Sequence, residues 1–180
     1  MKKVLILSAS PRRGGNTDTL CDRFMQGAVE AGHQVEKIFL KDKNIAYCSG
    51  CGYCFGGATG KCTINDDAAE INQKMIDADV LVFSTPVYFY SMAAQMKTLI
   101  DRTTPRYREM ANKEIYYILA AADDELEATH RTIEAFRGFT IDCLKGAKEC
   151  GVIFGDGTFM PGDVKDKPAY NQAYETGKKV

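Results

Sequence analysis

Residues 8–18 hold the first group of side chains that could bind a ligand. They read SASPRRGGNTD and lie between an apolar run at residues 4–7 and an amphipathic segment that begins near Thr17. When a buried strand ends in such a stretch and a helix follows, several backbone N–H groups and the positive end of the helix dipole meet at one point, which suits an anion. The stretch therefore predicts a phosphate site, and a turn that only reverses the chain is the alternative. The candidate ligands are Ser8, Ser10, Arg12, Asn16 and Thr17.

A second group of candidates lies at residues 85–90, which read TPVYFY and follow another apolar run. Consecutive aromatic residues beside backbone amides suit a flat heteroaromatic ring, which needs both stacking and hydrogen bonds at its edge. Pro86 restricts the backbone so that the N–H groups after it can face such a ring. Packing of the aromatic side chains under a helix is the alternative. The candidate ring contacts are Pro86, Val87, Tyr88 and Phe89.

A third group follows the next apolar run, at residues 120–123, which read AAAD. Small side chains there would let a ring approach closely, and Ala121 is a candidate for this contact. Asp123 is a candidate by its position alone, and a role at the start of the following helix is the alternative. A phosphate at one end and a flat ring at the other describe flavin mononucleotide (FMN).

Four of the seven cysteines lie close together, in a stretch without helical periodicity at residues 41–63. They form the pattern Cys48-x2-Cys51-x2-Cys54-x7-Cys62. Two-residue gaps let neighbouring sulfurs face one side of a metal cluster, and the longer gap lets the chain fold over it, as four-iron clusters require. A tetrahedral zinc site fits less well, because structural zinc usually draws on two separated pairs. Reduced thiols that merely line a loop are the remaining interpretation.

The other cysteines, Cys21, Cys143 and Cys150, are predicted to be small buried apolar residues. An odd total argues against a complete disulfide framework. Because the net charge is −1, the chain has no basic field, and neither nucleic acid nor an anionic membrane is an expected partner. The apolar run at residues 4–7 is too short for a signal peptide, so we expect a cytoplasmic protein.

The apolar and amphipathic segments alternate along the chain, which predicts parallel strands joined by right-handed crossovers with helices on both faces. We expect an α/β fold in one domain over residues 1–180: a flavodoxin-like three-layer sandwich with five parallel strands in the order 2-1-3-4-5. In that order the three candidate loops meet at one edge of the sheet. The expected strands are 3–7, 35–40, 79–84, 114–120 and 150–154, and the expected helices are 17–31, 66–77, a helix capped by Ser91, 125–145 and 168–176.

Residues 10–17, SPRRGGNT, resemble the phosphate loop of the NAD(P)H-dependent FMN reductase branch of flavodoxin-like proteins, and residues 78–92 resemble its ring-binding segment. This resemblance implies bound FMN, ring contacts from residues 86–89, and a homo-oligomer (a dimer or tetramer) with the site near a subunit boundary. It also implies phosphate contacts from Ser10, Arg12, Asn16 and Thr17. The cysteine pattern is similar to that of the iron–sulfur flavoproteins, which implies a possible 4Fe-4S cluster.

These features favour an FMN-dependent oxidoreductase that NAD(P)H reduces by hydride transfer. Electrons would then pass to a small acceptor such as a quinone, or to a redox protein. No side chain need act as an acid or base, because the cofactor carries the chemistry. Two alternatives remain open: an iron–sulfur flavoprotein that transfers electrons between partner proteins, and a flavin-binding sensor without catalytic activity.

Overall fold

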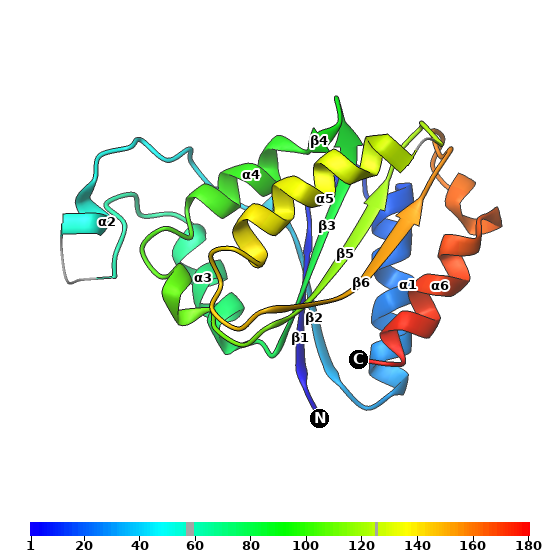
Figure 1. The fold of residues 1–180 in the computed structure, drawn as a ribbon, viewed down its shortest axis with the longest axis horizontal. Helices are drawn as coiled ribbons and strands as arrows, with labels where there is room; N and C mark the ends of the chain where they lie inside the picture. Colours follow the sequence, from blue (N-terminus) through cyan, green and yellow to red (C-terminus); the bar gives the residue numbers. More distant parts are fainter. Residues whose placement is uncertain (57–59, 125) are drawn as a thin grey trace.

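A parallel β-sheet forms the middle layer of the protein, in a computed structural model that describes residues 1–56, 60–124 and 126–180 (Figure 1). Within these residues five strands run parallel in the order β2-β1-β3-β5-β6, and a short strand, β4, pairs antiparallel with β3. The predicted flavodoxin-like fold and the order of its parallel strands are therefore confirmed. The strands are β1 (Lys3–Ser8), β2 (Gln34–Phe39), β3 (Val80–Tyr88), β4 (Ser91–Met92), β5 (Glu114–Ala120) and β6 (Lys148–Gly155).

Helices cover both faces of the sheet because its strands are apolar on both sides. Along β1, Leu5 and Leu7 pack toward one face, and Val4 and Ile6 toward the other. Helices α1 and α6 cover one face, and α3, α4 and α5 cover the other (Figure 1). In the described ranges, none of the helices is long and apolar enough to cross a membrane. The helices are α1 (Asn16–Glu30), η1 (Leu40–Asp42), α2 (Tyr53–Gly56), α3 (Ala68–Asp77), α4 (Ala94–Asp101), η2 (Tyr107–Glu109), α5 (Leu126–Thr140), η3 (Asp163–Asp166) and α6 (Pro168–Gly177).

The prediction of a loop at residues 85–90 and of a helix capped by Ser91 is wrong. Strand β3 continues to Tyr88, and Ser91 pairs with Tyr88 in a two-residue hairpin. Both central residues of the turn are left-handed, with φ of 50° at Phe89 and 61° at Tyr90. Such turns usually contain glycine or asparagine, so two aromatic residues gave no sequence signal for this one. Helix α4 begins only after Ala93, whose N–H donates to the hydroxyl group of Thr85 at 2.9 Å.

The helix predicted over residues 125–145 ends earlier, at Thr140, and residue 125 lies outside the described residues. The hydroxyl group of Thr140 donates to the carbonyl oxygen of Phe136 at 3.0 Å and contacts the Tyr117 hydroxyl group. This anchors the last turn of the helix on β5, and the chain then turns back to begin β6.

Two of the three scattered cysteines differ from their predicted burial. Cys21 is buried as predicted, and burial raises the pKa of its thiol to about 12. Cys143 and Cys150 are exposed, so their prediction is wrong. Cys143 lies in the turn after α5, and Cys150 lies on β6, the edge strand of the parallel sheet, where one side of the strand is open to solvent.

Close contact between α1 and α6 depends on a glycine in each helix. A Cβ atom at Gly27 would collide with the carbonyl oxygen of Tyr174, and one at Gly177 would collide with that of Phe24. We expect Gly27→Ala to lower the free energy of unfolding by about 1–3 kcal/mol through overpacking. Gly138→Ala in α5 is the control, because a Cβ there meets nothing within 4 Å, and it should be neutral or slightly stabilising. Urea unfolding measures both, and equal effects would contradict the prediction.

Candidate functional site

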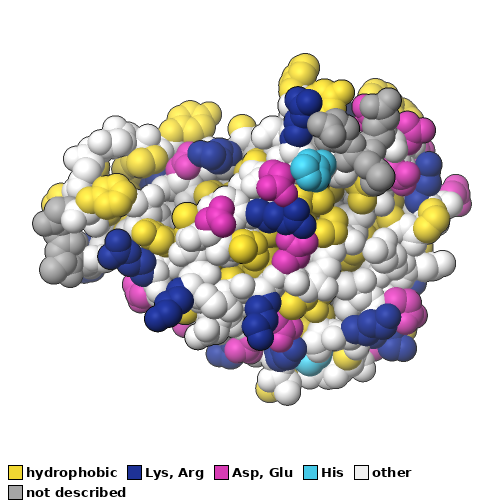
Figure 2. Space-filling model, viewed as in Figure 1, with side chains coloured by type: hydrophobic (Ala, Val, Ile, Leu, Met, Phe, Trp, Pro, Cys, Tyr) yellow, Lys and Arg dark blue, Asp and Glu magenta, His cyan; other side chains and the backbone are white. Residues whose placement is uncertain are grey.

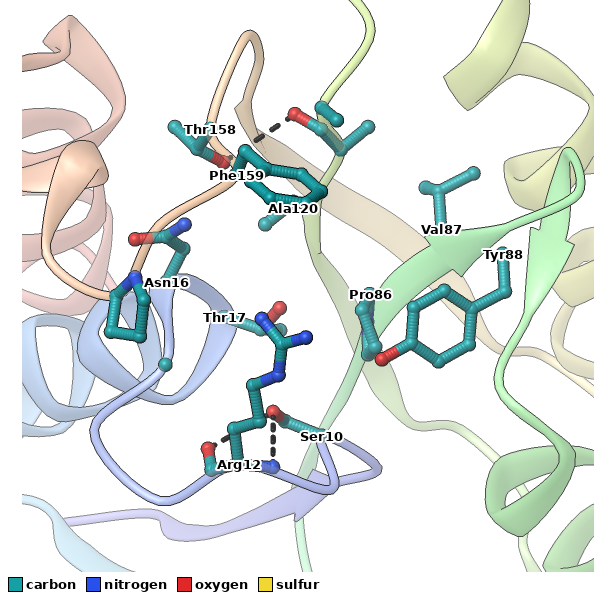
Figure 3. Close-up of a pocket in the computed structure, with 14 residues that line it drawn as sticks. Ser10, Arg12, Asn16, Thr17, Pro86, Val87, Tyr88, Ala120, Thr158 and Phe159 are labelled. Atoms are coloured by element: carbon teal, nitrogen blue, oxygen red, sulfur yellow. Dashed lines mark hydrogen bonds between the residues drawn. The ribbon is translucent and has the colours of Figure 1, made fainter.

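A pocket of about 210 Å³ lies at the carboxyl ends of β1, β3 and β5 (Figure 3). This edge is where the strand order reverses, which is where doubly wound sheets bind ligands. The walls come from four segments that are distant in sequence: the loop after β1, the end of β3, and the loops after β5 and β6. The lining residues are Ser10, Arg12, Gly15, Asn16, Thr17, Pro86, Val87, Tyr88, Ala120, Ala121, Ala122, Thr158, Phe159 and Pro161.

One end of the pocket is polar because α1 begins there. Gly15 is the N-cap residue of α1, and no side chain of the described residues caps the helix. The N–H groups of the first helical turn are therefore available to an anion. The loop before them is held by Ser10, whose hydroxyl group accepts from the N–H of Arg12 at 3.2 Å and donates to its carbonyl oxygen at 3.1 Å. A Cβ at Gly15 would lie 3.1 Å from both the Cβ and the carbonyl oxygen of Arg12, so the turn favours glycine.

The two adjacent arginines of this loop have different surroundings. Among the described residues that line the pocket, Arg12 is the one charged side chain, and Figure 3 shows it extending from the loop into the pocket. Arg13 instead forms an ion pair with Asp42, and its guanidinium group lies 4.6 Å from the centre of the Phe39 ring. The pocket therefore carries one positive charge, which Arg12 supplies.

The other end of the pocket is apolar. Pro86 and Val87 form one wall at the end of β3, and Ala121 lines the pocket directly after β5. Tyr88 and Phe159 stand at the rim and are 45% and 68% exposed. Small and flat apolar side chains of this kind fit a planar ring.

Asn16 has a role that sequence reasoning did not find. Its amide nitrogen donates to the carbonyl oxygen of Met160 at 3.0 Å, and its amide oxygen accepts from the N–H groups of Gly162 at 3.1 Å and Val164 at 3.3 Å. The side chain lines the pocket but is already engaged in holding the loop after β6 against α1. Asn16 therefore shapes the pocket by positioning its far wall.

Three of the predicted site residues lie outside the pocket lining. Ser8 is fully buried at the end of β1, and its hydroxyl oxygen has no hydrogen-bond partner among the described residues. Phe89 is fully exposed at the tip of the β3–β4 hairpin. Asp123 is half-buried in the loop after β5, where its carbonyl oxygen accepts from the N–H of Gly157 at 3.3 Å. The other predicted residues of the FMN site line the pocket.

Sequence reasoning missed the loop after β6 as a wall of the pocket. Thr158 fixes this loop, because its N–H donates to the carbonyl oxygen of Ala121 at 2.8 Å and its hydroxyl group donates to that of Gly155 at 2.9 Å. The available signal was the position of the glycine-rich loop directly after a parallel strand, at the same edge as the other loops. The lining residues from this missed loop are Thr158, Phe159 and Pro161. The lining residues Gly15, Ala120 and Ala122 lie within the predicted groups but were not named as individual candidates.

A second cavity, of about 180 Å³, lies in the cysteine loop, which we define as residues 46–64. All four clustered cysteines line it: Cys48, Cys51, Cys54 and Cys62. Within the described residues they do not stand in a metal-binding arrangement. Thiolates are nevertheless the donors that iron–sulfur clusters use. The pKa of the Cys51 thiol is lowered, mainly by a backbone hydrogen bond from Tyr53 and also by hydrogen bonds from the hydroxyl groups of Thr63 and Ser49. A lower pKa favours the thiolate, which is the form that binds metal.

A buried ion pair closes the base of the cysteine loop. The side chains of Arg102 and Asp66 are only 1% and 3% exposed and share two hydrogen bonds, of 2.7 and 3.0 Å. Arg102 also donates to the carbonyl oxygens of Ala46 at 2.8 Å and Ile64 at 3.3 Å, at the two ends of the loop. One side chain from the end of α4 therefore ties both ends of the loop to the body of the protein.

The fold and the pocket together define the class of the protein. The sheet is flavodoxin-like, the loop after its first strand suits an anion, and an apolar cleft lies beyond that loop. This combination is typical of the mononucleotide-binding α/β proteins. Comparison with known families then gives the group within that class. Residues 2–143 match the sequence model of the NADPH-dependent FMN reductases, so the chain belongs to this family.

Known relatives agree with this assignment. An iron–sulfur flavoprotein from Archaeoglobus fulgidus is 40% identical over 105 residues, which cover 58% of this chain and 46% of the relative. The chain thus matches about half the length of that protein.

Two solved structures share the fold. An NAD(P)H:quinone oxidoreductase from Methanothermobacter marburgensis has a TM-score of 0.75 and 19% identity, with 99% of this chain and 96% of the other covered. An FMN-dependent NADH-azoreductase from Bacillus anthracis, in complex with FMN, has a TM-score of 0.75 and 15% identity, with 99% of each chain covered.

Proposed function

We propose that residues 1–180 form one FMN-binding domain of an oxidoreductase that uses NAD(P)H to reduce the flavin. Electrons then pass to a small acceptor such as a quinone, or to another redox protein. The observation that carries this proposal is the division of the pocket into a polar end at the start of α1 and an apolar end at the carboxyl ends of β3 and β5. Membership of the family, the FMN in the azoreductase structure and the name of the quinone oxidoreductase support it.

Each end of the pocket suits one part of FMN. At the polar end, Ser10, Thr17 and the first N–H groups of α1 would hold the phosphate, and Arg12 would supply charge. At the apolar end, Pro86 and the other small or flat residues would orient the ring and shield it from water. When bound, FMN supplies hydride acceptance from a nicotinamide and electron transfer to the acceptor. No histidine or carboxylate is among the described lining residues, so binding and orientation are the contribution of the chain.

Adjacent arginines provide a matched test of the phosphate end. We expect Arg12→Gln to raise the dissociation constant for FMN about tenfold or more, because a charge-assisted hydrogen bond to the phosphate is lost. Arg13→Gln should leave FMN affinity almost unchanged, because Arg13 is engaged with Asp42 and Phe39 outside the pocket. Fluorescence titration of the apoprotein measures both values. Equal affinities for the two variants would contradict the assignment of the phosphate end.

Electron transfer through an iron–sulfur cluster is the second candidate function, because the four clustered cysteines line one cavity. In this proposal Cys48, Cys51, Cys54 and Cys62 hold a 4Fe-4S cluster, which when bound supplies one-electron transfer. The relative named an iron–sulfur flavoprotein supports it. Because thiols stay reduced in the cytoplasm, a cytoplasmic location suits such a centre. Anaerobic purification followed by iron and sulfide analysis tests it. We expect about four irons per chain, and iron-free protein would contradict the cluster.

We also propose that the chain forms a homo-oligomer, either a dimer or a tetramer, because apolar side chains are exposed around the rim of the pocket. Large apolar side chains are exposed at the β3–β4 hairpin and in the loop after β6 (Figure 2). A second copy of the chain that covers this rim would bury them and would also enclose the ring end of the site. The residues are Tyr88, Phe89, Tyr90, Phe159 and Met160. Light scattering of the FMN-bound protein tests this, and a monomer at micromolar concentration would contradict it.

A further inference from the structure

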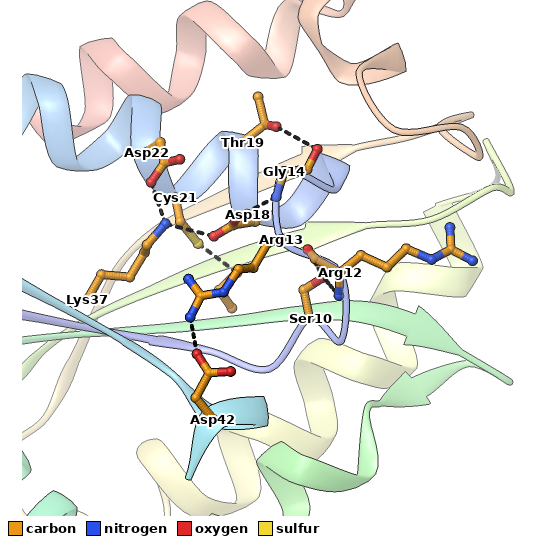
Figure 4. A network of polar contacts seen from close by, with 11 residues as sticks. Ser10, Arg12, Arg13, Gly14, Asp18, Thr19, Cys21, Asp22, Lys37 and Asp42 are labelled. Carbon is orange, nitrogen blue, oxygen red and sulfur yellow. Dashed lines mark hydrogen bonds and ion pairs between the residues drawn. The ribbon is translucent and has the colours of Figure 1, made fainter.

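Behind the phosphate loop lies a polar network that does not line the pocket (Figure 4). The side chain of Lys37, on β2, forms ion pairs with Asp18 at 2.7 Å and with Asp22, both on α1. Asp18 is 7% exposed and Lys37 is 19% exposed, whereas Asp22 is 60% exposed. The pair between Lys37 and Asp18 is therefore shielded from solvent, and its charges act over a longer range than surface charges do.

Asp18 connects this network to the loop. One of its carboxylate oxygens accepts from Lys37, and the other accepts from the N–H of Gly14 at 2.8 Å. Gly14 has a φ of 67°, so the hydrogen bond holds a left-handed residue in the middle of the phosphate loop. The carboxylate thus fixes the loop, but it also places a buried negative charge next to Thr17, which lines the pocket.

From this arrangement we infer that Lys37 is a positioning residue for the phosphate of the flavin, since its charge cancels that of Asp18 behind the phosphate loop. The inference rests on the proposed FMN function. An unpaired carboxylate at this place would repel a phosphate dianion while leaving an uncharged flavin almost unaffected. Lys37 therefore contributes to the preference for FMN over riboflavin, although it is not among the residues that line the pocket.

The surroundings of Lys37 favour its charged form. Burial lowers the pKa of the Lys37 ammonium group, but the hydrogen bonds and charges of Asp18 and Asp22 outweigh burial and raise the pKa above its ordinary value of 10.5. The lysine is therefore protonated at neutral pH. In Lys37→Met the three-residue network loses its one positive charge and keeps two carboxylates.

A double substitution distinguishes the effect of the Lys37 charge from the effect of losing the lysine side chain. In Asp18→Asn combined with Lys37→Met, the network regains its original net charge, and the asparagine amide oxygen can still accept from the N–H of Gly14. We expect Lys37→Met alone to weaken FMN binding about tenfold, with riboflavin binding within about twofold of the wild type. The double variant should recover most of the lost FMN affinity. Lys74→Met is the control, because Lys74 also pairs with two carboxylates, Glu36 and Glu70, away from the pocket.

Fluorescence titration of the apoproteins with FMN and with riboflavin gives the ratio of the two dissociation constants. The inference is overturned if Lys37→Met leaves this ratio unchanged, or if the double variant binds FMN no better than Lys37→Met does. A wild-type protein that binds FMN no better than riboflavin removes the proposed phosphate site and this inference together. Normal FMN preference in the wild type with no effect of Lys37→Met removes this inference alone.

Discussion

Replacement of Arg102 with methionine is expected to lower the free energy of unfolding by about 3–5 kcal/mol, the cost of breaking a buried ion pair. The substitution removes the guanidinium group that pairs with Asp66 and leaves that carboxylate buried without a counter-charge. It also removes the hydrogen-bond donor to the carbonyl oxygens of Ala46 and Ile64. Urea unfolding at neutral pH measures the loss, and proteolysis within residues 46–64 should increase in the variant.

A second arginine pair offers a matched control for this experiment. Arg137 and Glu149 also form an ion pair in which the guanidinium group donates two hydrogen bonds of 2.7 Å to the carboxylate oxygens. Their side chains, however, are 37% and 25% exposed. Because solvent screens this pair, Arg137→Met should cost only about 1 kcal/mol or less. If the two methionine variants lost equal stability, burial of the Arg102 pair would not be the source of its effect.

The pH dependence of the Arg102 effect follows from Asp66. Burial raises the pKa of the Asp66 carboxyl, but hydrogen bonds from Arg102 and from the backbone of Ala46 and Ala68 outweigh it and hold the pKa below its usual value of 3.8. The paired carboxylate therefore stabilises the fold above pH 3.8, and the stabilisation is lost as the pH falls through the lower, folded value. The difference in stability between the wild type and Arg102→Met should shrink accordingly in acid.

Ala122→Trp is expected to weaken FMN binding by about 100-fold, equivalent to about 2.7 kcal/mol. Ala122 lines the pocket and is exposed, so a larger residue there would obstruct the ring in the proposed site without crowding the core. Ala135→Trp, at an exposed position on α5 outside the flavin pocket, is the control. Fluorescence titration measures both. Unimpaired FMN binding by Ala122→Trp would place the ring elsewhere.

The order of the strands and the position of the loop after β1 at the pocket could be predicted because they depend on local patterns. Alternating apolar and amphipathic segments predict the parallel sheet, and the sheet order then predicts which loops meet. The small residues and glycines of residues 8–18 predict a helix start that suits an anion, whatever the rest of the chain does.

Features that depend on contacts between distant residues could not be predicted in this way. Asn16 was predicted as a phosphate ligand, but the loop that engages its amide lies more than a hundred residues later. Two ion pairs likewise join different parts of the chain: Arg102 with Asp66, and Lys37 with Asp18. The periodicity of the sequence does not predict which charged residues pair. The turn at Phe89 has no local signal either, because the pairing of β3 with β4 imposes a left-handed backbone on an aromatic residue.

Absorbance spectroscopy of the anaerobic protein, mixed with FMN and then with NADPH or NADH, tests the proposed function most directly. We expect the protein to retain FMN through gel filtration, to lose the yellow absorbance of the oxidised flavin when the nicotinamide is added, and to regain it when a quinone follows. Protein that stays colourless after FMN is added, or whose bound flavin responds to neither nicotinamide, would contradict the proposal that this pocket serves an NAD(P)H-dependent flavin oxidoreductase.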